Sequence, residues 1–279
     1  MAHVKIGNYN QLEVVKTVDF GVYLDGHDDG EILLPTRYVP EGCQMGDMLN
    51  VFIYLDQEER LIATTLEPLV KVGEFAYLEV AWVNQFGAFL DWGLMKDLFV
   101  PFREQKMKML KGHKYVVHCH IDEDSYRIMA SAKIEKFLSD EMPDYNPGDE
   151  VEVLVYQKTD LGFKVIVENK FSGMLYQNEL FQYVHSGDRL TAFVKQVRPD
   201  GKIDLKLQNN GRAQISEFSN TLLEYIKAHD GHCRFHDKSS TDEIYNEFEV
   251  SKKVFKKAVG DLYKQHLIVL KGDDGIYLA

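Results

Sequence analysis

The chain has 279 residues, of which 27% are charged and 45% hydrophobic, a composition typical of an ordinary globular protein. No apolar run approaches the roughly 18 to 20 residues that a membrane span needs, and the first ten residues lack the pattern of a signal peptide. We therefore expect a cytoplasmic protein without membrane contact. A net charge of −12 and three widely separated cysteines argue against a strongly basic polyanion binder and against a disulfide framework.

A unit of sequence recurs three times along the chain. Gly21, Gly87 and Gly162 each lie within an apolar strand pattern, and a second glycine follows each of them 25 residues later. An offset of 66 residues aligns the first copy with the second without a gap and matches, among others, Phe20 with Phe86. A repeated supersecondary unit predicts a series of small domains.

Each repeat predicts five short strands. In the first repeat, apolar residues alternate along 12–18, and a strand with an internal glycine is expected at 20–24. The glycine predicts a bulge or a sharp coil of the strand at that point. Further strands are expected at 32–35, 48–55 and 60–65. Five short strands are best closed into a barrel, because closure removes the exposed edges.

The pattern changes after residue 211, where the apolar residues take a helical period. A first helix is expected with Ser216 as its N-cap, a second capped at Thr241, and a third that runs from its cap Ser251 to about His266. The buried face of the third helix is expected to carry Val254, Phe255, Ala258, Leu262 and Tyr263. Apolar residues in a hairpin pattern then end the chain. Three helices followed by a hairpin are the order of a winged helix-turn-helix.

Two levels of resemblance follow from these motifs. The F-G-[AV]-[FY]-L strands at 20–24 and 86–90, the Gly-Asp start of the fourth strand at 46–47 and 187–188, and the five-strand order resemble the S1 domain, an OB-type RNA-binding barrel. The whole domain order resembles the bacterial conserved virulence factor B family, most specifically over 92–101. Members are regarded as RNA-binding proteins without known catalysis. The resemblance therefore implies RNA binding.

The predicted fold is mainly β, with three tandem S1/OB-type five-stranded barrels followed by an α+β winged helix-turn-helix domain. The predicted parts are barrels at 1–68, 69–139 and 148–211, a linker at 140–147 and the winged helix at 212–279. The net charge is −8 in the first barrel and +1 in the second. Because phosphate approach is opposed by negative charge, the second barrel is the better candidate for binding RNA.

The resemblance to S1 domains implies where bases would stack. Phe20 and Tyr23 of the first barrel and Phe86 and Phe89 of the second occupy the stacking positions, each stacked base contributing about 1–3 kcal/mol. The side chains expected to flank these rings are Phe99, Arg37, Arg60, Arg103 and Arg127. For each ring the alternative is a place in the core, since a small barrel has little else to bury.

The third barrel departs from this pattern, because Leu161 and Lys164 stand where the aromatic residues would be. A structural or spacing role is therefore expected for it. In the winged helix, the third predicted helix carries lysines that would contact phosphates, and the alternative is an ordinary solvated helix face. These lysines are Lys252, Lys253, Lys256 and Lys257.

Two histidine clusters are candidate metal sites. Within eight positions the chain contains His229, His232, Cys233 and His236, a spacing that can ligate zinc, but no second cluster completes a tetrahedral set. In the second repeat, His118 and His120 align with aromatic residues of the first repeat and are expected to replace them. No metal and no cofactor are therefore predicted.

The sequence contains no phosphate loop, nucleophile elbow or paired-acid site in a defined context, so no catalytic residues are predicted. The function expected is that of a non-catalytic protein that binds single-stranded RNA as a post-transcriptional regulator. The alternative is a protein-interaction scaffold or a winged-helix DNA-binding regulator. Under both hypotheses, the winged helix could bind a further partner, either duplex nucleic acid or a protein.

Overall fold

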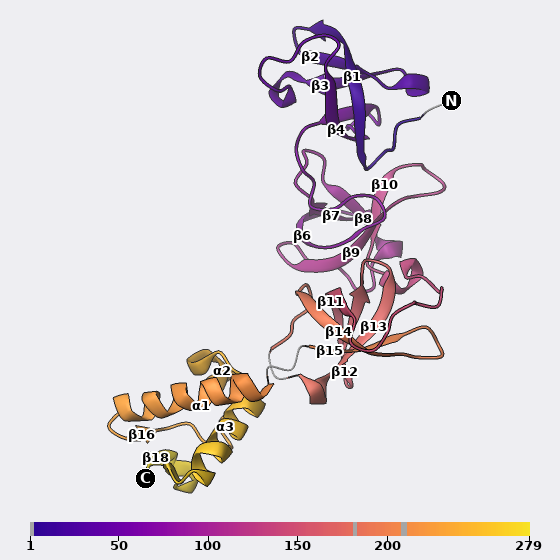
Figure 1. The fold of residues 1–279 in the computed structure, drawn as a ribbon. Helices are drawn as coiled ribbons and strands as arrows, with labels where there is room; N and C mark the ends of the chain where they lie inside the picture. Colours follow the sequence, from indigo (N-terminus) through magenta and orange to yellow (C-terminus); the bar gives the residue numbers. More distant parts are fainter. Residues whose placement is uncertain (1–2, 181–182, 208–210) are drawn as a thin grey trace. The chain divides into compact units, whose positions relative to one another are not determined.

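The structure is a computed structural model that describes residues 3–180, 183–207 and 211–279 (Figure 1). Its contacts divide into two compact units, Met1–Ser139 and Asp140–Ala279. The first unit contains two closed five-stranded barrels, and the second contains a third such barrel followed by a helical domain with a small sheet. The predicted fold class is confirmed. The three barrels lie within the predicted ranges, whose exact boundaries remain predictions.

The two barrels of the first unit have the same strand order, in which the fifth strand lies between the third and the fourth. The strands of the first barrel are β1 (Tyr9–Val18), β2 (Gly21–Asp25), β3 (Glu31–Pro35), β4 (Met48–Leu55) and β5 (Leu61–Thr64). Those of the second are β6 (Phe75–Val83), β7 (Gly87–Asp91), β8 (Leu98–Pro101), β9 (Lys114–Ile121) and β10 (Ile128–Ser131).

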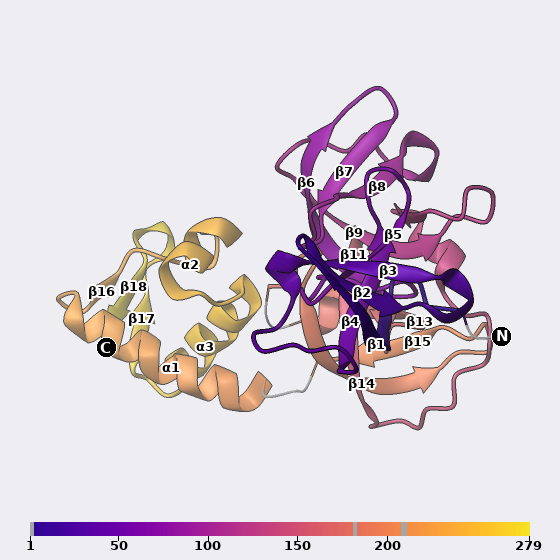
Figure 2. The same ribbon diagram turned by 90° about the horizontal axis from the view of Figure 1, so that it is seen from above.

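The second unit repeats the barrel and adds three helices. Its barrel strands are β11 (Glu150–Thr159), β12 (Gly162–Val167), β13 (Phe171–Tyr176), β14 (Arg189–Val197) and β15 (Ile203–Lys206). The helical domain contains α1 (Gly211–Ala228), β16 (His232–Cys233), α2 (Thr241–Phe248), α3 (Lys252–Lys264), β17 (Ile268–Leu270) and β18 (Ile276–Leu278). Its sheet has the order β16-β18-β17, and β18 and β17 contact α1 and α3, respectively (Figure 2).

Short 3₁₀ helices connect several strands. They are η1 (His27–Asp29), η2 (Thr36–Tyr38), η3 (Phe102–Glu104), η4 (Ile134–Phe137), η5 (Gln177–Glu179) and η6 (Gly272–Asp274). The second of them follows the third strand of barrel 1, as η3 and η5 do in the other two barrels. A single 3₁₀ turn therefore follows the third strand in each of the three barrels.

The glycine that marks each repeat lets two strands approach closely. A Cβ atom at Gly21, Gly87 or Gly162 would lie 2.2, 2.2 or 2.1 Å from a backbone oxygen of the third strand. The bulge predicted at this glycine lies instead in the first strand, where the register shifts between Val14 and Lys16 and at the equivalent place in the other barrels. The glycine therefore serves close strand contact and the bulge is one strand away.

The helix starts differ from two of the predictions. Because α1 begins at Gly211, Ser216 lies inside the helix and is not its cap. Residues 208–210, which precede the predicted change of period, lie outside the described residues. The N-cap of α2 is Ser240 and not Thr241, because the Ser240 hydroxyl accepts a hydrogen bond from the Glu243 backbone and the Glu243 carboxylate accepts one in return. Such a reciprocal capping box satisfies two otherwise free N–H groups.

The third helix agrees more closely with its prediction. Ser251 is its N-cap and accepts a hydrogen bond from the backbone N–H of Val254. The buried residues of α3 are Val254, Phe255, Ala258, Val259 and Leu262. The ring of Tyr263, which was expected on this face, is instead 52% exposed. It comes directly after Leu262, one helix position away from the buried stripe.

A shared core joins the two barrels of the first unit. Phe52 and Tyr54, on β4 of barrel 1, pack edge-on against Trp92 of barrel 2, with ring centroids 5.9 and 6.4 Å apart. Trp92 is buried, and its Nε1 atom donates a hydrogen bond of 2.6 Å to the carbonyl oxygen of Lys96. The aromatic side chains of one barrel thus complete the hydrophobic core of the next.

Candidate nucleic-acid interface

Barrel 2 presents a row of three aromatic rings on adjacent strands. Trp82 on β6, Phe89 on β7 and Phe99 on β8 are cross-strand neighbours in register. The rings of Trp82 and Phe89 lie parallel, with centroids 3.7 Å apart and 3° between their planes, and the Phe89 and Phe99 centroids are 4.9 Å apart. Stacked and tilted rings on one barrel face are the kind of platform on which unpaired bases stack.

The edge of this row is open to solvent. Trp82 is 42% exposed, and Phe86, which precedes β7, is 63% exposed. The Nε1 atom of Trp82 donates a hydrogen bond of 2.7 Å to the Asp97 carboxylate, which fixes the plane of the indole ring. Of the rings predicted to stack, Phe86 is thus exposed, while Phe89 and Phe99 are half-buried beneath or beside Trp82. None of these rings is sealed in the core.

Trp82 was not among the predicted site residues. In a regular strand it would share the buried face of Leu78 and Val80, four and two positions earlier. The bulge between Val80 and Trp82 shifts the register, so that Trp82 turns to the outer face. The repeat contained a signal for this orientation, because the offset of 66 residues aligns Trp82 with Lys16, a residue expected on an outer face.

Barrel 1 builds a smaller version of the same row. Its Lys16 and Tyr23 are cross-strand neighbours, and the Lys16 Nζ atom lies 5.2 Å from the centroid of the Tyr23 ring. Phe20 is 57% exposed and meets Tyr23 edge to face, with centroids 6.3 Å apart. The Lys16 ammonium also lies 3.7 Å from the Glu31 carboxylate, which offsets its charge. The predicted ring pair of barrel 1 is therefore accessible in an acidic setting.

Barrel 3 has no aromatic residue in this row. The three cross-strand neighbours are Gln157, Lys164 and Met174, and Leu161, at the position of Phe86, is 66% exposed. The row thus has the same register in all three barrels, while its stacking surface is confined to barrels 1 and 2.

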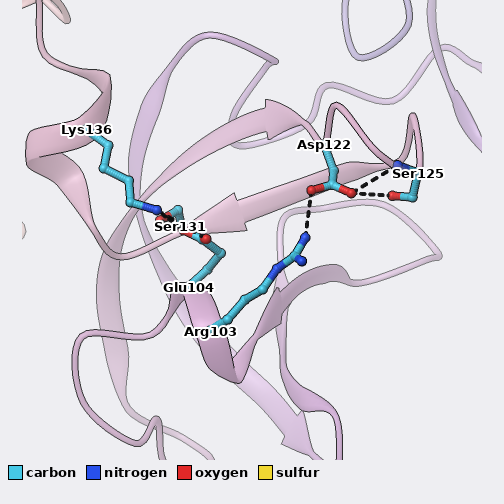
Figure 3. A network of polar contacts seen from close by, with 6 residues as sticks. All are labelled: Arg103, Glu104, Asp122, Ser125, Ser131 and Lys136. Carbon is cyan, nitrogen blue, oxygen red and sulfur yellow. Dashed lines mark hydrogen bonds and ion pairs between the residues drawn. The ribbon is translucent and has the colours of Figure 1, made fainter.

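The arginines predicted to flank the rings contact other protein groups. Arg103 forms an ion pair of 2.8 Å with Asp122, whose carboxylate also accepts hydrogen bonds from the Ser125 hydroxyl and backbone (Figure 3). Those bonds from Ser125, together with the charge of Arg103, hold the pKa of Asp122 below its usual value. Arg103 remains 61% exposed, so its guanidinium keeps an open side.

Three further arginines also have protein partners. Arg60 binds the Asp56 carboxylate at 2.8 Å. Arg127 of barrel 2 forms an ion pair with Glu59 of barrel 1. Arg37 lies 4.9 Å from the ring centroid of its neighbour Tyr38 and donates a hydrogen bond to the Met95 sulfur. The structure therefore brings Arg127 and Arg37 to the junction of the two barrels, where they connect the repeats.

The loop between β7 and β8 connects these features. Its Lys96 donates a hydrogen bond of 2.6 Å to the carbonyl oxygen of Asp56 in barrel 1, and burial there lowers the pKa of the Lys96 ammonium. Met95 of the same loop contacts Arg37, and Asp97 holds Trp82. The loop thus links the ring row of barrel 2 to the η2 segment of barrel 1.

The histidine cluster of barrel 2, His118 and His120, lies under η4. His118, on β9, is 92% buried, since 8% of its surface is exposed, and its ring centroid lies 4.1 Å from that of Phe137. His120 lies 4.9 Å from the same ring. Burial, followed by the neighbouring His120, lowers the pKa of His118 to about 4. These histidines do replace aromatic residues, and Lys136 of η4 binds Glu104 at 3.3 Å to hold the segment in place (Figure 3).

The histidines of the cluster in the winged helix domain each contact a different group. A ring nitrogen of His229 lies 2.8 Å from the Tyr225 carbonyl oxygen, and one of His232 lies 2.8 Å from that of Asp274. Cys233 is buried, and burial raises the pKa of its thiol. Across residues 3–180, 183–207 and 211–279, no three His, Cys, Asp or Glu side chains are grouped so as to hold a metal ion.

The four predicted lysines of α3 fall into two pairs. The Lys252 ammonium donates a hydrogen bond of 2.7 Å to the carbonyl oxygen of Ser239, and that of Lys253 donates to the carbonyl oxygen of Asn178. The side chains of Lys256 and Lys257 are exposed. The first pair therefore takes part in contacts within the chain, and the second faces solvent. None of the helices in the described residues is both long and apolar enough to cross a membrane.

Comparisons with known proteins agree with this architecture. The S1 domain family matches residues 6–66, and the CvfB-like winged helix domain family matches residues 220–278. A Streptococcus pneumoniae structure, described as a multidomain protein with nucleic acid binding domains, is similar over 98% of each chain at 24% identity and a TM-score of 0.44.

S1 barrels followed by a winged helix define a class of multidomain nucleic-acid-binding proteins. Within that class, the uncharacterized protein YitL of Bacillus subtilis is 31% identical over 92% of this chain and 89% of its own length. Conserved virulence factor B of Staphylococcus saprophyticus is 22% identical over 95% of this chain and 92% of its own. The chain belongs to the conserved virulence factor B family.

Proposed function

We propose that this protein is a non-catalytic regulator that binds single-stranded RNA in the cytoplasm, with barrel 2 as its main stacking surface. The observation that carries this proposal is the solvent-facing row of Trp82, Phe89 and Phe99, with Phe86 beside it. Stacking on such rings tolerates any base and contributes about 1–3 kcal/mol for each base. Duplex nucleic acid offers no unpaired base faces to this row.

The charge distribution supports stacking as the main source of affinity. The chain has a net charge of −12, and the predicted arginines are largely paired with acids or placed at the barrel junction. A binder that relies on few phosphate contacts loses little affinity with added salt, because few counterions are released. We therefore expect a shallow salt dependence for RNA binding.

The loop that carries Met95 and Asp97 suggests a path for the strand. It lies between the ring row of barrel 2 and Arg37, which follows β3 of barrel 1 near the exposed Phe20. A single strand longer than one barrel's site would cross this loop and reach the Phe20–Tyr23 pair. The exposed Lys256 and Lys257 of α3 would add phosphate contacts in the second unit.

The decisive experiment titrates a fluorescently labelled single-stranded RNA of about 12 nucleotides with the full chain and follows its anisotropy. Phe86→Ala combined with Phe89→Ala should weaken binding at least tenfold, since two rings are lost. The matched control is Leu161→Ala with Met174→Ala, at the barrel 3 positions that correspond to Phe86 and Phe99, and it should stay within about twofold. Unchanged affinity in a folded Phe86/Phe89 double variant rejects the proposal.

A second titration separates RNA binding from the alternative of a winged-helix DNA regulator or a scaffold. Duplex DNA of the same length should bind more weakly than single-stranded RNA and should lose affinity more steeply with salt. Preference for duplex DNA, with no effect of the ring substitutions, would instead assign nucleic-acid binding to the winged helix. Failure to bind either nucleic acid would favour the scaffold.

A further inference from the structure

The winged helix domain contains a cavity of about 370 Å³ between α3 and the wing, by which we mean β17, η6 and β18. Val259 and Leu270 provide its accessible apolar surface, and Phe255 and Ile276 also line it but are fully buried. His236, Asp237 and Lys256 also line it and supply polar groups. An apolar cavity with a few convergent polar groups, at the lower end of the usual size range, is typical of a site for a small ligand.

Gly260 forms part of the wall of this cavity and has no role in the packing of the chain. It lies inside α3, where glycine costs about 1 kcal/mol relative to alanine. A Cβ atom at Gly260 would meet no other atom within 4 Å, whereas one at Gly275, also in the wall, would lie 2.3 Å from the Cys233 carbonyl oxygen. Close packing therefore requires Gly275, while the absence of a side chain at Gly260 only leaves the cavity open.

The polar side of the cavity is held in place by the loop before α2. The Lys252 ammonium binds the Ser239 carbonyl oxygen at 2.7 Å and fastens this loop to α3. In the loop, the Nδ1 atom of His236 accepts a hydrogen bond of 3.3 Å from the backbone N–H of Lys238. A neutral imidazole that accepts at Nδ1 carries its proton on Nε2, which is then a donor.

The three polar side chains offer complementary chemistry to one ligand. The Lys256 ammonium and the His236 N–H donate to an anionic group, while the Asp237 carboxylate accepts hydrogen bonds from hydroxyl groups. The apolar surface of Val259 and Leu270 suits a flat, weakly polar ring. A simple aromatic acid would leave the Asp237 carboxylate beside the ligand without a donor.

We infer that this cavity binds a ribonucleotide, with the base against Val259 and Leu270, the ribose hydroxyls on Asp237 and the phosphate on Lys256 and His236. The ribonucleotide is either a free nucleoside monophosphate or the terminal nucleotide of an RNA strand. This site is separate from the ring row of the barrels. Its existence does not depend on the proposed function, because the lining residues come from the winged helix domain alone.

The test measures binding of adenosine 5′-monophosphate to the full chain by isothermal titration calorimetry. Gly260→Leu places a side chain in the cavity and should weaken binding at least tenfold. The matched control is Asp261→Leu, an exposed neighbour on α3 that does not line the cavity and should bind as the unsubstituted chain does. Absence of binding to the unsubstituted chain at millimolar nucleotide, or equal binding by both variants, overturns the proposal.

Two measurements keep this test interpretable. Both variants are compared by circular dichroism, and Gly260→Ala is added because alanine favours the helix and fills less of the cavity. It should raise the melting temperature and weaken binding less than leucine does. A Gly260→Ala variant that is stabilised and a Gly260→Leu variant that binds normally would together show that the cavity is not the site.

The phosphate contact is tested by a pair of lysine substitutions on the same helix. Lys256→Ala should weaken adenosine monophosphate binding about tenfold, as expected for loss of a charge-assisted hydrogen bond. Lys264→Ala removes an equal charge from an exposed position outside the cavity and should have little effect. Adenosine without phosphate should bind both variants equally. An equal loss of nucleotide affinity in both lysine variants would contradict a specific phosphate contact.

A final experiment with labelled RNA distinguishes a free nucleotide from the terminal nucleotide of an RNA strand. If the cavity holds the terminal nucleotide of a strand, Gly260→Leu weakens RNA binding and adenosine monophosphate competes with the RNA. If it holds a free nucleotide, RNA binding is unchanged while nucleotide binding is lost. Both results support the cavity as a ribonucleotide site. The Phe86/Phe89 double variant reports on the barrels independently, so failure of either proposal is distinguishable from failure of the other.

Discussion

Barrels 2 and 3 place different side chains on the same three-stranded row. In barrel 2 the neighbours are Trp82, Phe89 and Phe99, and in barrel 3 their places are taken by Gln157, Lys164 and Met174. Strand order, bulge and register are the same in both barrels. The fold thus fixes where the row lies, and only the residue types decide whether it offers rings to a nucleotide. Four sets of substitutions test how far residue types, within one common fold, set the stability and the RNA binding of the barrels.

The largest effect is expected from the two tryptophans of barrel 2, one buried and one exposed. Trp92→Ala should lower the free energy of unfolding by about 3–5 kcal/mol, because it empties the core that barrels 1 and 2 share. Trp82→Ala, on the exposed row, is the matched control and should cost less than half as much. Urea denaturation followed by circular dichroism measures both. Equal costs would contradict the shared core.

The next effect concerns His118, which occupies the place that Phe52 has in barrel 1. Its pKa is about 4 in the fold against 6.5 in a free histidine, so the unfolded chain binds its proton first as the pH falls. The free energy of unfolding is therefore unaffected by this group above pH 6.5, and it falls by about 3 kcal/mol as the pH is lowered from 6.5 to 4.

His118→Phe copies barrel 1 at this position and should remove that loss. The measurement is urea denaturation of both proteins at pH 7 and pH 4.5. His113→Phe, at an exposed histidine directly before β9, is the control and should keep the acid sensitivity. If the loss persists in His118→Phe, another group causes it.

A graft tests whether residue types alone distinguish the two barrels. Gln157→Trp with Lys164→Phe gives barrel 3 the cross-strand pair of barrel 2 in the same register. The affinity for single-stranded RNA should rise by about 1–3 kcal/mol, the value of one stacked base. Gln157→Leu with Lys164→Leu supplies apolar bulk without rings and should give no such gain. Anisotropy titration measures both, and equal gains would point to a general hydrophobic effect.

The smallest effect is expected from the hydrogen bond that orients Trp82. Asp97→Asn weakens the acceptor for the indole N–H and should lower RNA affinity by about 1 kcal/mol, roughly fivefold. The control is Asp124→Asn, which removes an equal charge in the exposed turn between β9 and β10. An equal change in both variants would mean that charge, and not ring orientation, sets the affinity.

Much of the fold followed from the sequence because the repeat and the strand pattern agree. The glycine spacing and the apolar alternation predicted five strands in each barrel, and the helix order predicted the winged helix. The site was less predictable. Trp82 has the spacing of a buried residue after Leu78 and Val80, and only the bulge turns it outward. A bulge depends on the neighbouring strand, so a strand's own period does not contain it.

Ion pairs between repeats were also beyond sequence reasoning. Arg127 seemed a flanking cation for RNA, yet its partner Glu59 comes from a turn of the preceding barrel. No pattern within one repeat specifies a contact with another. The lysines of α3 illustrate the same limit, because Lys252 has the helical spacing of a solvated face but reaches the carbonyl oxygen of Ser239.

The Trp92 contact has a consequence for biosynthesis. Barrel 1 completes its last strand at Thr64, before Trp92 has been synthesised. Until then the sides of Phe52 and Tyr54 that Trp92 covers stay exposed on the nascent polypeptide, although Tyr9 of β1 already packs against Phe52. The amino-terminal barrel therefore depends on continued translation, or on a chaperone, to shield it from aggregation during the interval before its neighbour folds.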